Sequence, residues 1–252
     1  MMNEKIIVSI PVRNTEQFIE EAVSSVLSQD YPNLHLNIYE GQSTDNTKEL
    51  LRKYEKFKNV SIIYTTNSGS PCRAIKRCLE LPDADIIIPL MADDFFIHNS
   101  VVSSFANEFR KTNADFIYGN CYVVDRYNSS KIIRNFKNFN YDINDLKLGN
   151  HPHWSSVAFK RNLIKDLDFN NNDFKLACDF DFYIKILSNT KYKSCYLDNF
   201  TSKHRNAGAS SKNLLTMISA NSEAFKSWKN NGIKVSKLFW LRKFFVKIKQ
   251  FI

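Results

Sequence analysis

The sequence has few cysteines and no two of them in a CxxC spacing. Its five cysteines are scattered along the chain, at Cys72, Cys78, Cys121, Cys178 and Cys195. An odd number of unclustered cysteines is not the pattern of a disulfide framework. We therefore expect a protein that works in a reducing compartment, the cytoplasm.

Long apolar runs are missing as well. No stretch of about 18 or more apolar residues occurs, so no transmembrane helix is predicted. The first residues, Met1 to Lys5, lead directly into a short strand-like run and do not have the pattern of a signal peptide. Internal repeats and low-complexity segments are also absent. We expect one globular α/β domain, with at most a small appendage.

The sequence does have an excess of positive charge. Its 252 residues include 35 Lys and Arg against 26 Asp and Glu, a net charge of +9, with 43% hydrophobic residues. That charge points to an anionic partner: a nucleic acid, a phosphorylated substrate or a membrane surface. The bases concentrate beside aromatic residues near the C-terminus and no nucleic-acid-binding motif occurs, so we do not expect a nucleic acid partner.

The first half of the chain alternates short apolar runs with amphipathic stretches. The spacing predicts strands over 5–12, 34–39, 60–64 and 86–90, and helices over 16–29, 47–57 and 72–81. Such an alternation predicts a parallel sheet with right-handed crossovers.

The second half is less regular. We expect helices over 99–111, 178–187 and 214–228, strands over 114–119, 121–125, 151–159 and 192–199, an irregular segment over 131–148 and a loop over 204–211. The predicted fold class is therefore α/β, with a Rossmann-like mixed and mainly parallel sheet flanked by helices.

The chain is organised around the stretch Ile86 to Phe96, in which a buried-strand pattern runs directly into Asp93 and Asp94. In open parallel sheets, ligands bind beyond the carboxyl ends of the strands. Paired carboxylates at that place suit a hard divalent cation, and a cation suits a diphosphate. Alternatively, the two acids only start a turn or cap the helix that follows.

Four short stretches stand in order along the chain: VSIPVRN from Val8, YEGQSTDNT from Tyr39, LMADD from Leu90 and ACDFDFY from Ala177. Together they resemble family 2 glycosyltransferases of the GT-A fold, over about residues 5–210. The stretch DFIYGN from Asp115, and the run from His153 through Lys160 and Arg161 to the acidic helix, also resemble the bacterial cell-surface polysaccharide type of that family. The resemblance implies an inverting, metal-dependent enzyme. It would move a sugar from a nucleotide donor, expected to be a UDP-sugar, to a lipid-linked or growing cell-surface glycan.

The resemblance also implies where the donor base binds. Pro11, Val12 and Arg13 would line the base, and Arg73 would meet the base or a phosphate. Glu40 stands where the family usually has Asp, and it would accept a hydrogen bond from the uracil ring. The alternative for Glu40 is a solvated acid in a turn.

The donor diphosphate would lie beside the paired acids. One of Asp93 and Asp94 would bind Mg²⁺ or Mn²⁺ between the phosphates, and the other would hold the ribose or orient the first. His204 and Arg205 would close over the diphosphate, unless they belong to an ordinary basic surface loop.

Asp179 matches the family's catalytic base, which takes the proton from the acceptor hydroxyl. Asp181 lies on a different side of the same helix, where its charge would complement the helix dipole. His153 and Trp154 would line the acceptor or sugar pocket, and buried packing is the alternative for Trp154. Cys178 stands where many relatives have Glu.

Further departures from the family pattern are Met91, which replaces an acid, and Lys76 and Cys78, which replace Asn and Gly. The changes at Lys76 and Cys78 bear on the identity of the donor more than on the class of reaction. Glu40, Met91 and Cys178 keep open a second hypothesis, a degenerate module that binds nucleotide-sugars without turnover. A third, a sugar nucleotidyltransferase, normally needs a Gly-rich loop after the first strand, where this chain has RNTE from Arg13.

Residues 238–252 form the clearest non-catalytic pattern. On a helical wheel, one face carries Trp240, Leu241, Phe244, Phe245, Ile248, Phe251 and Ile252, and the other carries Arg242, Lys243, Lys247 and Lys249. Aromatics opposite bases predict a helix lying in an anionic membrane interface, with packing on the domain or a partner as the alternative. We thus expect a catalytic domain over 1–230, a basic amphipathic helix within 231–252, and a place on the inner face of the cell membrane.

Overall fold

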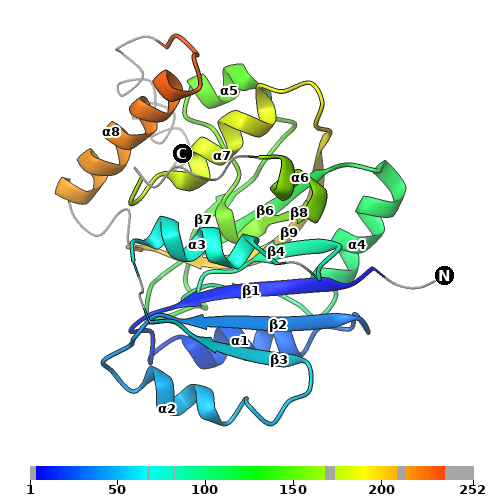
Figure 1. The fold of residues 1–252 in the computed structure, drawn as a ribbon, viewed down its shortest axis with the longest axis vertical. Coiled ribbons are helices and arrows are strands. Elements are labelled where there is room, and N and C mark those ends of the chain that lie inside the picture. The colour runs from blue at the N-terminus through cyan, green and yellow to red at the C-terminus, as the bar shows by residue number, and fades with distance from the viewer. Residues whose placement is uncertain (1–3, 67–68, 82, 168–173, 209–213, 236–252) are drawn as a thin grey trace.

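A single curled sheet with helices on both faces forms the centre of this computed structural model, which describes residues 4–66, 69–81, 83–167, 174–208 and 214–235 (Figure 1). The strands are β1 (Ile6–Val12), β2 (Leu34–Glu40), β3 (Val60–Tyr64), β4 (Ile86–Pro89), β5 (Phe95–Phe96), β6 (Phe116–Val124), β7 (Ile132–Phe136), β8 (Val157–Lys160) and β9 (Ser194–Arg205). Their order in the sheet is β3-β2-β1-β4-β8-β6-β9-β5, with β7 paired to β6. The predicted mixed α/β fold is confirmed.

The helices connect these strands. They are α1 (Ile19–Leu27), α2 (Thr47–Arg52), α3 (Pro71–Leu79), α4 (Val101–Thr112), α5 (Ile143–Lys147), α6 (Arg161–Asp166), α7 (Cys178–Leu187) and α8 (Leu214–Asn230), with a 3-10 turn, η1 (Trp154–Ser156). In Figure 1, α3, α5, α6, α7 and α8 lie above the parallel strands, and α1 and α2 lie below them.

The four strands β3, β2, β1 and β4 form a parallel ladder, as their sequence predicts. Their apolar runs are continuous because both faces of the sheet are covered. Ile7 and Ile87 belong to the core under α3 and α7, whereas Ile6, Val8 and Ile88 belong to the core under α1 and α4. All four strands therefore end at one edge, where the loops after β1, β2 and β4 gather.

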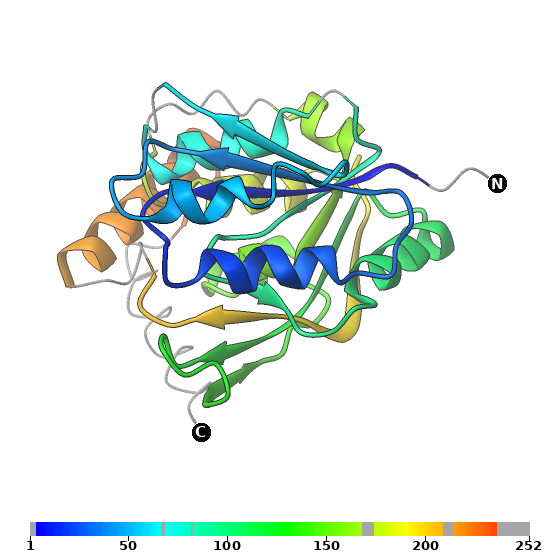
Figure 2. The ribbon, with the colours of Figure 1, turned by 90° about the horizontal axis from the view of Figure 1, so that it is seen from below.

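The other half of the sheet curls back toward this edge. β8 runs antiparallel to β4 and to β6, and β9 runs parallel to β6. The two residues of β5 pair with the end of β9, Phe95 with Lys203 and Phe96 with Ser202. Figure 2 shows α1 between the parallel strands and β9, drawn in gold. The curl brings the end of β9 to the turn that follows β4.

Three expectations for the second half were wrong. Residues 131–148 are not irregular, since they contain β7 and α5. Strand β9 is longer than predicted and includes His204 and Arg205, which were expected in a loop. β7 pairs only with β6 and is largely exposed, so its sequence lacks the apolar alternation of a half-buried strand. The two strands expected over 114–125 form the single strand β6.

Helix α8 is held on α7 by polar contacts and by a buried tryptophan. One carboxylate oxygen of Glu223 accepts the backbone N–H groups of Lys175, Leu176 and Ala177, at 3.0, 2.8 and 3.0 Å. These groups precede the first turn of α7, so the acid also lies at the positive end of that helix. Trp228 is fully buried and packs edge-on against Phe180.

The chain turns back onto the domain after α8. The Ile233 N–H donates to the Trp228 carbonyl at 3.0 Å, and Ile233 and Val235 pack against the core. The predicted helix over 238–252 lies outside the described residues. Within the described part of the chain, none of the helices has the length and apolarity needed to cross a bilayer.

Candidate active site

Asp94, His204 and His153 form a cluster at the carboxyl edge of the sheet. Asp94 lies in the turn between β4 and β5, is fully buried, and donates its N–H to the Met91 carbonyl at 3.0 Å. His204 Nδ1 lies 3.1 and 3.2 Å from the two Asp94 carboxylate oxygens. The His153 ring centre is 3.8 Å from that of His204. One potential ligand atom from each residue lies within 4.8 Å of the others.

The Asp94 carboxylate is oriented by two further donors. The Ser155 hydroxyl donates to Oδ2, and the Arg205 backbone N–H donates to Oδ1 at 3.2 Å. Ser155 is placed by the 3-10 turn η1, which His153 caps by accepting the Ser155 N–H at 3.4 Å. One short turn therefore supplies both an imidazole of the cluster and the hydroxyl that orients its carboxylate.

Asp94 and His204 favour each other's charged forms, whereas His204 disfavours a charge on His153. Burial opposes ionisation of Asp94, but the neighbouring His204 holds the pKa of Asp94 below its ordinary value. Burial also opposes the charged form of His204, yet Asp94 raises the pKa of His204 above its ordinary value. Burial and the charge of His204 lower the pKa of His153 far below its ordinary value, so this imidazole stays neutral. A neutral imidazole is the form that binds a metal.

Asp93 has a different set of partners. Arg126 Nη1 lies 3.2 Å from Asp93 Oδ2, and its guanidinium packs 4.7 Å from the centre of the Phe18 ring. Burial and the adjacent charge of Asp94 raise the pKa of Asp93. The cluster of potential metal ligands includes Asp94 and leaves Asp93 out.

The side chain of Arg205 packs against neighbouring side chains of the protein and does not extend into solvent. It is 5% exposed, forms an ion pair with Glu21 on α1, and lies over Phe18 and Phe95 at 5.0 and 5.1 Å from the ring centres. Its neighbour His204 reaches Asp94 instead. Of the two residues expected to close over a diphosphate, the structure thus places His204 in the cluster and pairs Arg205 with a helix.

The residues expected to bind a base lie at the ends of β1 and β2. Val12 is the register partner of Glu40. Glu40 is 1% exposed, and its carboxylate accepts the N–H of Ser43 at 2.5 Å and that of Gln42 at 3.1 Å. It is therefore a buried acid that orders its own turn, not a solvated one. Pro11 is half-buried and Arg13 is exposed beside this turn.

Two further expected residues lie at the amino ends of helices. Arg73 is exposed in the first turn of α3, which Ser70 caps by accepting the Arg73 N–H at 3.3 Å. Asp179 is half-buried in the first turn of α7 and accepts the Phe180 N–H at 2.8 Å. The Cys178 N–H donates to Cys72 Sγ at 3.3 Å, so the amino ends of α3 and α7 meet.

Asp181 does not share the setting of Asp179. It is 4% exposed and accepts hydrogen bonds from Ser227 Oγ at 2.5 Å and Asn231 Nδ2 at 2.8 Å, with Lys185 Nζ at 3.1 Å. Its partners therefore tie α7 to α8. The expectation that Asp181 only complements the helix dipole missed these contacts.

The donor atoms of the cluster fit a divalent cation. Bonds of about 2 Å place the ligands of one ion about 3–4 Å apart, and the potential ligand atoms of this cluster lie within 4.8 Å of one another. Two imidazole nitrogens beside a carboxylate suit Mn²⁺ better than Mg²⁺, which prefers oxygen ligands.

A comparison with models of protein families confirms the family that the sequence motifs resemble. Residues 7–168 match the model described as glycosyl transferase family 2. The chain belongs to glycosyltransferase family 2. An uncharacterized glycosyltransferase of Haemophilus influenzae is 28% identical over 220 residues, covering 86% of this family 2 chain and 82% of that protein.

Two other comparisons name ligands of the proteins concerned. The UDP-Glc:alpha-D-GlcNAc-diphosphoundecaprenol beta-1,3-glucosyltransferase WfgD of Escherichia coli is 30% identical over 129 residues, covering 50% of this chain and 48% of WfgD. The crystal structure of glucosyl-3-phosphoglycerate synthase from Mycobacterium tuberculosis, with Mn²⁺, UDP and glucosyl-3-phosphoglycerate, has a TM-score of 0.63 and 15% identity, covering 92% of this chain and 82% of that one. The predicted GT-A fold is confirmed. This chain spans only about half the length of WfgD.

The sequence did not reveal the roles of several residues around the Asp94 cluster. Ser155 and Arg126 carried no signal, because their roles depend on pairings between distant segments. His153 was assigned to an acceptor or sugar pocket, whereas its ring lies against His204. Trp154 is buried and packs on Phe159 and Phe182, so the packing alternative holds for it.

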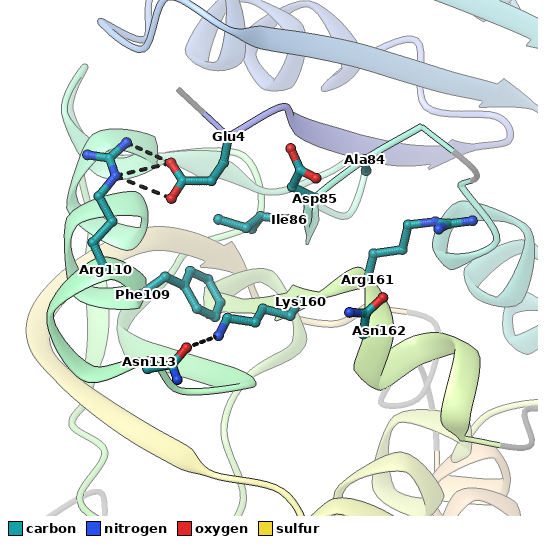
Figure 3. Close-up of a pocket in the computed structure, with 10 residues that line it drawn as sticks. All are labelled: Glu4, Ala84, Asp85, Ile86, Phe109, Arg110, Asn113, Lys160, Arg161 and Asn162. Carbon is teal, nitrogen blue, oxygen red and sulfur yellow. Dashed lines mark hydrogen bonds and ion pairs between the residues drawn. The ribbon is translucent and has the colours of Figure 1, made fainter. Parts of the chain in front are cut away.

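A cavity of about 430 Å³ lies at the opposite edge of the sheet, near the amino end of β4. Figure 3 shows the Glu4 carboxylate facing Arg110, and Lys160 extending to Asn113, at distances of 2.8 and 2.6 Å. Cations and acids alternate around this cavity, and its lining contains none of the residues expected at the donor site.

Proposed function

We propose that this family 2 enzyme transfers a sugar from a UDP-sugar, with inversion, by using the Asp94 cluster as its metal site. The observation that carries the proposal is the position of that cluster. It stands at the carboxyl edge of the parallel strands, next to the loops after β1 and β2 that resemble a base-binding site. Ligands of open α/β sheets bind at this edge.

In this proposal the donor lies across the edge of the sheet. Pro11, Val12 and Arg13 contact the base, and Glu40 accepts the ring N–H with a lone pair that its backbone contacts leave available. Arg73, at the positive end of α3, faces a phosphate or the base. Glu40 is one methylene longer than the Asp that the family usually has here, so its carboxylate would meet the base at a different position in the site.

Asp94, His204 and His153 would hold the cation, and of the two ions expected for the family, their nitrogen and oxygen donors suit Mn²⁺ better than Mg²⁺. When bound, it supplies positive charge that stabilises the leaving nucleoside diphosphate. Asp93 then orients the site through Arg126 or contacts the ribose.

Asp179 acts as the general base. It takes the proton from the acceptor hydroxyl as that oxygen bonds to the anomeric carbon, while the bond from this carbon to the diphosphate oxygen breaks. Attack from the face opposite the leaving group inverts the configuration. Cys178 does not supply a second negative charge, because burial and Cys72 raise the pKa of its thiol far above the ordinary value and keep it neutral.

The acceptor we propose is a lipid-linked or growing surface glycan, reached from the inner face of the cell membrane. The name of WfgD gives a lipid diphosphate as the acceptor of that relative. The basic aromatic pattern of residues 238–252 supports membrane contact by this chain. Because Ile233 and Val235 pack against the core, we extend the proposed catalytic domain to at least Val235, a few residues beyond the boundary expected at 230/231.

Thermal stability against a panel of nucleotides, with and without Mn²⁺, tests the proposal. We expect UDP to raise the midpoint of unfolding only with Mn²⁺, by an amount that corresponds to about 2.7 kcal/mol at a hundredfold excess over the dissociation constant. Asp94→Asn removes the shift. A shift with a different nucleotide would overturn the donor. Binding without turnover over a broad acceptor panel would favour the degenerate module.

A further inference from the structure

Strand β7 carries an arginine that faces the metal-ligand cluster. On β6, Val123 is the register partner of Arg134 on one side and of His204 on the other. Residues opposite one another on neighbouring strands project from the same face of a sheet. Arg134, Val123 and His204 therefore form one row across the sheet, with β7 lying beside β6 in Figure 1.

The side chain of Arg134 packs beside a ring that borders the cluster. Its guanidinium lies 5.2 Å from the centre of the Phe136 ring, and that ring meets His153 edge-on at 6.5 Å. Arg134 is thus a half-buried residue that borders the site on the β7 side.

The acids of the site have other partners. The contacts of Asp94 go to His204, Ser155 and the Arg205 backbone, and Asp93 pairs with Arg126. A divalent cation at the cluster and the guanidinium of Arg134 on its β7 side would both present positive charge to a substrate bound between them. Positive groups on two sides suit an anion such as a phosphate. A guanidinium fork matches phosphate oxygens in a bidentate geometry.

We propose that Arg134 binds a phosphate group beside the metal-ligand cluster. The inference rests on the proposed function, because it takes the substrates to be phosphorylated. The phosphate comes either from the donor diphosphate or from a phosphorylated acceptor. Arg134 approaches from β7, across β6 from His204, whereas the expected base site lies at β1 and β2.

Two binding measurements with purified full-length protein separate the two sources. The first is the dissociation constant of UDP, with GDP as an alternative nucleotide, in the presence of Mn²⁺. The second is the binding of inorganic phosphate to protein already saturated with Mn²⁺ and the nucleotide, followed by phosphorus NMR. Each is made on the wild type, Arg134→Met and Arg134→Lys. Lys137→Met is the matched control, since Lys137 is an exposed cation just beyond the end of β7.

We expect Arg134→Met to weaken one of the two affinities by about tenfold to a hundredfold, the range for a charge-assisted hydrogen bond. Arg134→Lys keeps the charge and recovers part of the loss, and Lys137→Met changes neither affinity. A loss in the first measurement identifies the donor diphosphate, and a loss in the second identifies an acceptor phosphate.

Three outcomes overturn the inference, and they differ in meaning. If Arg134→Met keeps the wild-type unfolding midpoint and both affinities, Arg134 does not bind phosphate, while the proposed function stands. If the wild type itself binds neither nucleotide with Mn²⁺, the proposed function fails and the inference fails with it. An equal loss in Lys137→Met would reduce the effect to general surface charge and would also overturn the inference.

Discussion

At the scale of single residues, Ser155 offers the sharpest test of the metal site. Its hydroxyl donates to Asp94 Oδ2, and it is not one of the three side chains that we propose as ligands, Asp94, His153 and His204. Groups that hydrogen-bond to ligands typically change metal affinity by about 10–100-fold when they are removed. We therefore expect Ser155→Ala to weaken Mn²⁺ binding by that factor, measured by titration of the ion in the presence of UDP.

The neighbouring serine supplies the control for this prediction. Ser156 is equally buried, but its hydroxyl donates to the His153 carbonyl at 2.8 Å and not to Asp94. Ser156→Ala should change the stability of the turn more than the affinity for Mn²⁺. Equal losses of affinity in the two variants would show that the hydroxyl of Ser155 has no special role.

Part of this site is readable from the sequence, residue by residue. Asp93 and Asp94 follow an obvious buried strand, so their position at the edge of the sheet could be predicted. The contact of Asp94 with His204 could not, because it depends on the two-residue strand β5 pairing with the end of β9. The inward direction of Arg205 depends on the same pairing. Contacts between segments more than 100 residues apart leave no local pattern.

At the scale of elements, helix α7 carries two acids whose roles we expect to be distinct. Asp179→Asn should lower kcat by at least about a hundredfold, the usual contribution of a general base, with little change in stability. Asp181→Asn should instead destabilise the protein, because it weakens buried hydrogen bonds to Ser227 and Asn231 on and after α8. A loss of about 1–3 kcal/mol is typical when a buried polar group loses its partner.

Activity and urea denaturation of both variants check this pair of predictions. Asp181→Asn, assayed below its unfolding midpoint, should keep a kcat within a few fold of the wild type. The assignment of the base would be wrong if Asp179→Asn turned over normally, or if Asp181→Asn folded normally and lost turnover.

The segment before β1 is tied to α4 by an ion pair whose effect depends on pH. Arg110 lies 2.8 Å from Glu4 and, through its hydrogen bonds, lowers the pKa of Glu4 below the ordinary value of 4.5. A carboxyl whose pKa is lowered in the folded state adds stability above its unfolded pKa, and loses it as the pH falls through the folded value. The pair is partly exposed, so solvent screening limits it to about 0.2–1 kcal/mol.

We expect Glu4→Gln to be less stable than the wild type at pH 7 by that amount. The difference should shrink as the pH falls below about 4.5, where the wild-type carboxyl also becomes neutral. Urea denaturation of both proteins at several pH values measures it, and high salt should reduce it at pH 7. A difference that stays constant down to acid pH would mean that packing, not charge, links Glu4 to α4.

The elements themselves were predictable to different degrees. β1, β2, β3 and β4 are buried on both faces, so continuous apolar runs reveal them. β7 is an exposed edge strand and α5 has only five residues, so neither produces a periodic pattern. The second half of β9, from Phe200, is polar because it lies along the site, and the sequence there reads as a loop.

At the scale of the whole molecule, the net charge of +9 and the basic, aromatic composition of the C-terminal segment both predict binding to an anionic membrane surface. Each Lys or Arg near an anionic lipid surface contributes about 1 kcal/mol to binding, and this contribution is screened by salt. The aromatic residues of the segment add apolar area that enters the interface. A transferase that binds its membrane through this segment should prefer anionic vesicles, and should leave them as ionic strength rises.

We therefore expect the double variant Lys243→Gln/Lys247→Gln to bind vesicles of phosphatidylglycerol about 10–30-fold more weakly than the wild type, since two charges are removed. Lys56→Gln/Lys58→Gln is the matched control, because it removes the same charge from an exposed loop between α2 and β3. Cosedimentation with vesicles measures both, and phosphatidylcholine vesicles should bind all three proteins weakly. If the two double variants lost binding equally, overall charge would attract the protein to the membrane. If neither lost binding, the C-terminal segment would instead pack on the domain or on a partner protein.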